Sequence, residues 1–437
     1  MFDLRDLTML HTADPQIEPE ASEAPRTYAW VVFGVTFCLL LSDYMSRQVL
    51  NAVFPHLKAE WMLTDARLGT LSGVVSFAVG ILAFPLSLLA DRWGRIRSLV
   101  LMALLWSLAT LGCALARDFQ HMFIARFLVG VGEAAYGSVG LAVVLMVFPA
   151  RLRATVTGTF LAGGMVGSVL GISLGGMLAD QFGWRTAFAG MALFGLVLAL
   201  CYPLIVTERR IAPTRAARAP GTREQRPALR TLVGSRSVIC AYLGSGVQVF
   251  VSGALLAWLP SYLNRYYGMS VSKAAVVAAI FVLASAAGMT IFGNLCDRVG
   301  RNSPARKLAL AIGYCLLCFV LLATAFQLPT GLPQLTLLGL GMFVGAGTVG
   351  PAGAMVANLT PAPIHGTAFA TLALANNLLG LAPGPVVVGL LADAYGLATA
   401  LQLMPLVCLL SAFIFAWARR SYRQDLQRVG VMSVGIA

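Results

Sequence analysis

Residues 123–147 form an apolar stretch long enough to cross a membrane as one helix, which takes about 20 residues. This stretch nevertheless carries Arg126 and Glu133. A charged side chain at the bilayer centre costs about 2.5–3.5 kcal/mol on insertion scales, so it normally faces protein or a water-filled cavity. The spacing between the two residues is about two helical turns, which places both on one face. Two interpretations follow: a structural ion network in which Arg126 reaches the nearby surface, or, as we favour, a proton and substrate site.

The composition indicates a polytopic membrane protein. Hydrophobic residues make up 58% of the chain and charged residues 11%, whereas a soluble domain is about a quarter charged. Twelve apolar spans are visible, six on each side of a polar stretch. They lie at about 28–53, 68–90, 98–116, 121–147, 154–178, 186–206, 236–263, 273–295, 308–328, 334–357, 366–391 and 397–418.

This pattern predicts an all-α fold of 12 transmembrane helices in two pseudo-symmetric six-helix bundles. The amino-terminal bundle is expected at 26–206 and the carboxy-terminal bundle at 236–418. Three further segments should be cytoplasmic: an acidic tail (1–25), the linker between the bundles (207–235) and a second tail (419–437).

The distribution of Lys and Arg predicts the orientation in the membrane. With a cytoplasmic amino terminus, 23 of the 31 Lys and Arg residues lie in inner segments and six in outer loops, as the positive-inside rule requires. Both termini should therefore be cytoplasmic, and we expect the protein in a bacterial inner membrane. The net charge of +13 then reflects topology and contact with anionic membrane lipids, and it implies no nucleic-acid partner.

The two halves share short repeated turns. Leu89–Arg95 after the second span matches Leu295–Arg301 after the eighth, and Leu178–Gly183 matches Leu391–Gly396. Duplicated halves of this kind build secondary transporters with two rocking bundles around a midplane site. A tight turn after each of these two spans can clamp helix ends through ion pairs on the closed face and release them when the bundles separate. The candidate residues for this conformational switch are Asp91, Arg92, Gly94, Arg95, Asp297, Arg298, Gly300 and Arg301. A plain basic loop explains the arginines, but not Asp and Gly at the same positions twice.

The two turns Asp91–Arg95 and Asp297–Arg301 resemble the characteristic inner-loop motif of the major facilitator superfamily of transporters. The resemblance to this superfamily extends over nearly the whole chain. Ser87 replaces the first glycine that is expected in the first copy, whereas Gly293 keeps it in the second. Three further segments resemble the Spinster-like branch, and the neighbouring anion:cation symporter family also has Arg and Glu seven apart in the fourth span. These segments are Asp43–Leu50, Arg126–Tyr136 and Gly183–Phe188. The Spinster-like resemblance implies transport of lipid-like or amphipathic organic molecules.

The same resemblance implies a coupling site made of an acid in the first span and the Arg and Glu of the fourth. Both related families typically have Asp immediately before the first-span Arg47, where this chain has Ser46. Asp43 lies one turn earlier, on nearly the same face. Glu133 is therefore the stronger candidate for the proton carrier, and Asp43 is the second candidate. The coupling ion is expected to be a proton, and no cofactor or metal is expected.

The substrate site is expected to draw on both bundles. No span interior of the second half carries an ionisable Asp, Glu, Lys or Arg, so that bundle should offer an apolar wall with amides. An amide in a span is also often a contact between helices, worth about 0.6 kcal/mol on average. The candidates for substrate binding are Arg47, Arg126, Ser46, Tyr136, Gln248, Asn376 and Asn377, the last two beside Pro383-Gly384-Pro385.

Three functions are weighed. The preferred one is a proton-coupled transporter of an amphipathic or lipid-like molecule with an anionic head group. The alternative is a proton-coupled organic-anion symporter in which Arg47 and Arg126 bind a carboxylate, since the planar guanidinium can bind both oxygens. A membrane-embedded enzyme is disfavoured because the sequence shows no metal or nucleophile constellation. Small organic or lipid-like substrates and membrane lipids are the expected partners, and the chain should function as a monomer.

Overall fold

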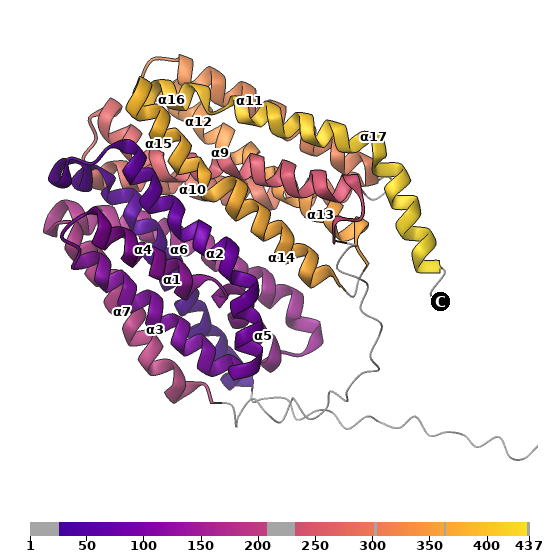
Figure 1. The fold of residues 1–437 in the computed structure, drawn as a ribbon, viewed down its shortest axis with the longest axis horizontal. Helices are drawn as coiled ribbons and strands as arrows, with labels where there is room; N and C mark the ends of the chain where they lie inside the picture. Colours follow the sequence, from indigo (N-terminus) through magenta and orange to yellow (C-terminus); the bar gives the residue numbers. More distant parts are fainter. Residues whose placement is uncertain (1–25, 208–231, 301–303, 362–363, 435–437) are drawn as a thin grey trace, which may run out of the picture.

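The computed structural model describes residues 26–207, 232–300, 304–361 and 364–434. This part of the chain is built from helices, and 12 of its helical segments are long and apolar enough to cross a membrane. Figure 1 shows them in two groups, indigo to magenta for the first half and rose to yellow for the second. The predicted fold class and number of spans are therefore confirmed.

The amino-terminal bundle contains six candidate spans, of which the fourth is made of two helices. Its helices are α1 (Arg26–Trp61), α2 (Asp65–Trp93), α3 (Arg95–Ala114), α4 (Phe119–Glu133), α5 (Tyr136–Val147), α6 (Arg153–Phe182) and α7 (Trp184–Ile205), with the short 3₁₀ helix η1 (Ala150–Leu152) before α6.

The carboxy-terminal bundle repeats this plan with more interrupted spans. Its elements are α9 (Arg236–Tyr267), α10 (Val271–Gly300), α11 (Pro304–Gln327), α12 (Leu332–Gly345), η4 (Ala346–Thr348), α13 (Val349–Leu359), α14 (His365–Ala375), η6 (Asn376–Leu381), α15 (Pro383–Tyr395), α16 (Leu397–Leu403) and α17 (Leu406–Val434).

Two predicted boundaries need correction. The stretch 123–147 is not one helix, because α4 ends at Glu133 and Ala135 leaves the helical region with φ −112° and ψ 0°. Such a break is tolerated at membrane depth where protein covers it, and Ala135 is buried. The last span is also interrupted, before Leu406, and α17 then continues as a helix into residues 419–434, which were expected to be a tail.

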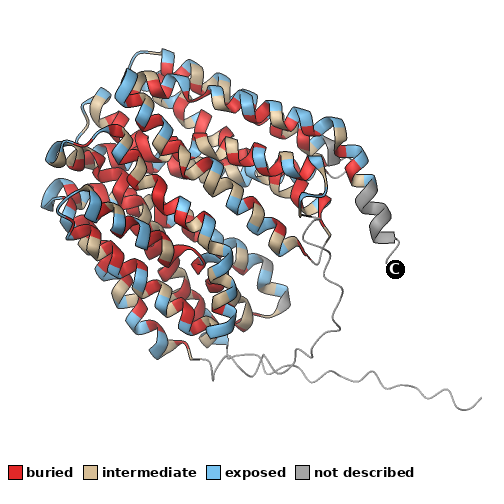
Figure 2. Ribbon diagram, viewed as in Figure 1, coloured by how far each residue is buried: buried red, intermediate tan, exposed pale blue. Residues whose placement is uncertain are grey.

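The two ends of the molecule differ in how the bundles meet. We call the end where α7 stops and α9 begins the linker face, and the end where α1 connects to α2 the opposite face (Figure 1). In α2, every buried residue except Ala90 lies between Asp65 and Gly80, the half nearer the opposite face. The buried residues of α10 likewise concentrate between Val271 and Val282. Figure 2 shows buried residues gathered between the helices and exposed ones along the outer surfaces. The bundles therefore pack together at the opposite face and separate toward the linker face.

The position of α1 depends on glycines of α6. A Cβ atom on Gly167 would lie 2.8 Å from the Tyr44 side chain, and one on Gly171 would lie 2.7 Å from the Met45 backbone. Side chains at these positions would force the helices apart, so the glycines bring α6 against the backbone of α1. This contact fixes the segment of α1 that carries the first-span charges.

Candidate functional site

Four ionisable side chains gather inside the amino-terminal bundle. Asp43 and Arg47 come from α1, and Arg126 and Glu133 come from α4. Only 7% of Asp43, 1% of Arg126 and 5% of Glu133 is exposed. The structure thus brings together the four charged residues that the sequence proposed for proton coupling and substrate binding.

Arg126 is held by backbone carbonyls of two neighbouring helices. Its Nη1 donates to the Ser46 carbonyl and its Nη2 to the Arg47 carbonyl, both at 3.0 Å. Its Nε donates to the Leu71 carbonyl of α2 at 3.4 Å. A guanidinium can satisfy its donors in this way without an anion. Arg126 therefore does not reach the surface, and it ties α4 to α1 and α2.

Arg47 has a different environment, although it belongs to the same cluster. Its Nη2 donates to the hydroxyl of Ser76 on α2, a neutral partner, and the residue is half-buried. Its charge also acts on the carboxyl groups of Asp43 and Glu133. Arg47 is therefore the arginine of the cluster whose side chain is less enclosed.

The two carboxyl groups lie side by side, one from each helix. The charges of Asp43 and Glu133 act on each other across this short separation. Among the described residues, no conventional donor satisfies either oxygen of Glu133. Two adjacent carboxylates repel each other in a low-dielectric site, and one proton shared between them relieves that repulsion. The pair is thus chemically suited to take up and release a proton.

Ser46 and Tyr136 lie in the packed core in this conformation. Both are fully buried, and the Tyr136 hydroxyl donates to the Thr36 carbonyl at 2.6 Å. Its ring meets Trp106 edge-on, with centroids 4.9 Å apart. In this conformation both residues contribute to the packing around the charged cluster, and their contact with substrate stays a prediction.

The predicted amides of the second half fall into two places. Gln248 is buried and donates to the Sγ atoms of Cys318 and Cys408, each at 3.7 Å. Asn376 accepts from Ser245 at 2.8 Å, and Asn377 donates to a carbonyl of its own helix.

The segment that begins at Asn376 is a turn of π-helix rather than α-helix. Pro383 and Pro385 follow it, and proline has no N–H to donate to a preceding carbonyl, which favours an irregular turn just before them. The turn closes with the Ala382 N–H donating to the Asn377 carbonyl at 2.9 Å. Such π-turns occur frequently at functional sites.

The repeated turns at the linker face each form an ion pair within their own bundle. Asp91 pairs with Arg95 at 3.0 Å, and Asp297 pairs with Lys307 at 3.1 Å. Gly94 has φ +98°, a conformation that favours glycine and explains its place in the turn. Arg301 lies outside the described residues. The side chains of Arg92 and Arg298 are exposed, and the described residues of the two turns make no ion pair between the bundles in this conformation.

The closed opposite face depends on residues that the sequence did not single out. Asp65 at the start of α2 binds both terminal nitrogens of Arg265 on α9, at 2.6 and 2.8 Å. Lys58 approaches the same carboxylate at 2.6 Å. The Asp65–Arg265 ion pair joins the two bundles across 200 residues of sequence.

The second repeated motif contributes to the same closure. Asp393, from Leu391–Gly396, accepts from the backbone N–H of Asp65 and of Ala66. Asp180, from the matching segment Leu178–Gly183, accepts from the Ser272 N–H at the start of α10. A carboxylate near a helix amino terminus is favourable, so both contacts stabilise closure. The repeat was therefore a sequence signal for these residues.

Comparisons with known proteins agree with this architecture. The sequence profile of the Major Facilitator Superfamily matches residues 36–345 and 262–430. A gallate transporter of Pseudomonas putida is 27% identical over 324 residues, 67% of this chain and 70% of that one. Protein spinster homolog 3 of Danio rerio is 28% identical over 251 residues, 56% of this chain and 50% of that one.

A solved structure supports the same assignment at the level of the fold. It is the inward-facing, unoccupied crystal structure of a bacterial homolog of the human lysosomal transporter Spinster. It aligns with a TM-score of 0.83 and 20% identity, over 92% of this chain and 99% of that one. The chain belongs to the major facilitator superfamily, and it is a membrane transporter rather than an enzyme.

Proposed function

We propose that the protein is a proton-coupled transporter that moves an organic anion by alternating access. The observation that carries this proposal is the cluster of two arginines and two carboxyl groups buried in the amino-terminal bundle. The spans of the other bundle carry no Asp, Glu, Lys or Arg in their described interiors, so the cluster dominates the charge at membrane depth.

Charge balance explains why a proton and an anion would travel together. With both carboxyl groups ionised, Asp43 and Glu133 cancel the charges of Arg47 and Arg126. Adding one proton and one substrate anion keeps the cluster neutral, whereas adding either alone leaves a net charge in a medium of low dielectric. The free energy that disfavours single occupancy is a coupling free energy, and it acts equally in both directions.

Arg47 is the proposed contact for the anion. Its present partner, the Ser76 hydroxyl, is neutral and can be exchanged for a carboxylate. Arg126 already donates to three carbonyls, so we assign it a positioning role that fixes the cluster and its positive charge. The amides of the π-turn at Asn376 and Asn377 are proposed to contact the rest of the substrate from the other bundle.

The linker face is proposed to be cytoplasmic. This orientation follows from the excess of Lys and Arg in the segments of that face. The conformation described above would then be open to the cytoplasm and closed at the external side by Asp65, Arg265 and the two capping aspartates. Alternating access would need these contacts to break while the linker-face turns come together.

A carboxylate is the substrate class that the relatives favour. The gallate transporter is named for an aromatic carboxylate. A lipid-like anion is the second candidate, supported by the similarity to spinster homolog 3. Both share the anionic group that Arg47 would bind.

Uptake into proteoliposomes tests the proposal. Gallate and a lysophospholipid would be offered under an imposed pH gradient, with methyl gallate as a matched neutral control. We expect one of the anions to accumulate, a protonophore to abolish accumulation, and the ester to be excluded. Accumulation driven by membrane potential in the absence of a pH gradient would contradict the electroneutral transport of one proton with one anion. Equal transport of the ester would contradict the anion site.

A further inference from the structure

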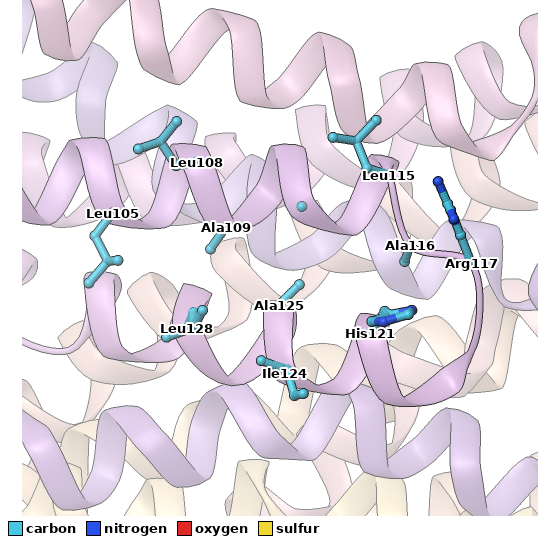
Figure 3. A pocket seen from close by; sticks show the side chains of 11 residues that line it. Leu105, Leu108, Ala109, Leu115, Ala116, Arg117, His121, Ile124, Ala125 and Leu128 are labelled. Atoms are coloured by element: carbon cyan, nitrogen blue, oxygen red, sulfur yellow. The ribbon is translucent and has the colours of Figure 1, made fainter.

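A groove of about 530 Å³ runs between α3 and α4, on the outside of the amino-terminal bundle and away from the charged cluster. Figure 3 shows leucines from both helices along its length and the side chains of Arg117 and His121 at one end. The hollow exists because small residues face each other on its floor. These are Ala109 and Gly112 on α3 and Ala125 on α4, where a Cβ on Gly112 would lie 3.6 Å from the Ala125 Cβ.

The dimensions of the groove match one leaflet of a membrane. Its lining runs along α3 from Leu105 to Leu115, about 15 Å at a rise of about 1.5 Å per residue. The hydrocarbon core of a bilayer is about 30 Å thick, so the groove is as deep as one leaflet. Arg117 lies beyond the end of α3 on the opposite face, at the end of this apolar lining.

Arg117 is the cation at the mouth of the groove. The neighbouring Asp118 carboxylate is directed to α4, where it accepts from the His121 N–H and lies 3.0 Å from the His121 Nδ1. The nearby Arg185 is neutralised by Glu60 at 2.8 Å. Arg117 makes no ion pair with the described residues and is exposed, so its guanidinium is accessible to a ligand.

We propose that this groove binds an anionic phospholipid of the leaflet on the opposite face. One acyl chain would lie between α3 and α4, and the phosphate would meet Arg117. An apolar groove one leaflet deep with a cation at its mouth fits a ligand that has an apolar chain and an anionic head group. A single basic residue near a membrane surface contributes about 1 kcal/mol toward an anionic lipid, which corresponds to about fivefold in occupancy.

Photo-labelling in vesicles tests the site with the full-length protein. The probe is phosphatidylglycerol with a diazirine near the end of one acyl chain, diluted into phosphatidylethanolamine. Phosphatidylcholine and a free fatty acid with the same diazirine form the comparison arms. We expect phosphatidylglycerol to label residues 105–128 more strongly than either comparison probe. Equal labelling by the fatty acid would overturn the phospholipid as occupant.

Two variants and their matched controls complete the test. Gly112→Leu fills the floor, whereas Gly313→Leu adds the same side chain to an exposed site on α11 with open space around it. Arg117→Gln removes the exposed cation, and Lys273→Gln removes another on the same face.

We expect Gly112→Leu to lose labelling of residues 105–128 by every lipid probe, and Arg117→Gln to lose about fivefold with phosphatidylglycerol alone. The two controls should behave as the unmodified protein. Unchanged labelling in Gly112→Leu, or in Arg117→Gln, would overturn the proposal. Because Arg117 is exposed, its variant keeps the test decisive even if Gly112→Leu does not fold.

Discussion

The carboxylate of Asp393 accepts hydrogen bonds from the N–H of Asp65 at 2.7 Å and from that of Ala66 at 2.9 Å, so one bundle caps a helix of the other. The pseudo-symmetric Asp180 accepts from the Ser272 N–H at 3.4 Å. Each contact joins the end of a span to the start of a span in the facing bundle. In each repeated half, an aspartate near the end of a span thus helps to close the opposite face by capping a helix of the other bundle.

Asp393→Asn should weaken this closure. An amide oxygen can still accept one hydrogen bond, but the negative charge near the first turn of α2 is lost, at about 1 kcal/mol or less. We expect the population open at the opposite face to rise by up to about fivefold. Spin labels at the exposed positions Met62 and Lys273, one on each bundle, would report the distance between bundles at that face.

Asp118→Asn is the matched control for this measurement. Asp118 also caps a helix at the opposite face, but its partners His121 and α4 belong to the same bundle. Its variant should leave the distance distribution between Met62 and Lys273 unchanged. An equal shift in both variants would show that the distance does not report the contact between bundles.

Asp91→Asn concerns the turns of the linker face. In the structure Asp91 pairs with Arg95 inside its own bundle, which is what an open linker face permits. If the turn holds the bundles together when the linker face is closed, the variant should spend more time with the linker face open. Cross-linking between cysteines placed at Thr159 on α6 and Ile291 on α10, in a background without the eight native cysteines, should then decrease. An unchanged yield would refute the clamp.

The sequence predicted the elements well and the contacts between them poorly. Hydropathy and the positions of Arg126 and Glu133 sufficed for the spans and for a charged site at membrane depth, because both depend on local composition. The carbonyls of Ser46 and Arg47 that hold Arg126 could not be predicted, since they come from another helix, about 80 residues away. The pairing of Asp65 with Arg265 was missed for the same reason, because pairing across bundles leaves no periodic pattern in the sequence.

Arg47→Lys and Arg126→Lys should have different consequences. A lysine at position 47 keeps the charge but loses the planar fork, so we expect substrate affinity to fall about tenfold with little change in stability. A lysine at position 126 cannot reproduce the three carbonyl contacts, and the loss of hydrogen bonds from a charged group should cost stability, about 1.5–3 kcal/mol.

Substrate binding and thermal unfolding, measured on the same purified variants, separate these two effects. A large loss of affinity in Arg126→Lys with unchanged stability would reverse the assigned roles of the two arginines. Unchanged binding in both variants would make the arginines structural and would contradict the anion site.

Glu133→Gln tests the proton carrier. Glutamine is neutral and has nearly the shape of the protonated acid, so the empty cluster of the variant keeps one positive charge that no carboxylate cancels. That charge favours binding of the substrate anion, but it disfavours reorientation of the empty transporter across the membrane. We therefore expect the variant to bind substrate and to exchange internal for external substrate, while accumulation driven by a pH gradient is lost. Radiolabelled exchange and gradient-driven uptake in the same proteoliposomes measure the two activities.

Asp43→Asn decides which carboxyl group carries the proton. The two groups are neighbours, so either could hold the proton while the other stays ionised. If Glu133 is the carrier and Asp43 only provides the second negative charge, Asp43→Asn should retain a pH-dependent step in exchange, whereas Glu133→Gln should make exchange independent of pH. The reverse pattern would assign the proton to Asp43, the acid one turn before Ser46. Accumulation at the wild-type level in Glu133→Gln would exclude Glu133 altogether, because no proton would then need to bind there for the cycle to proceed.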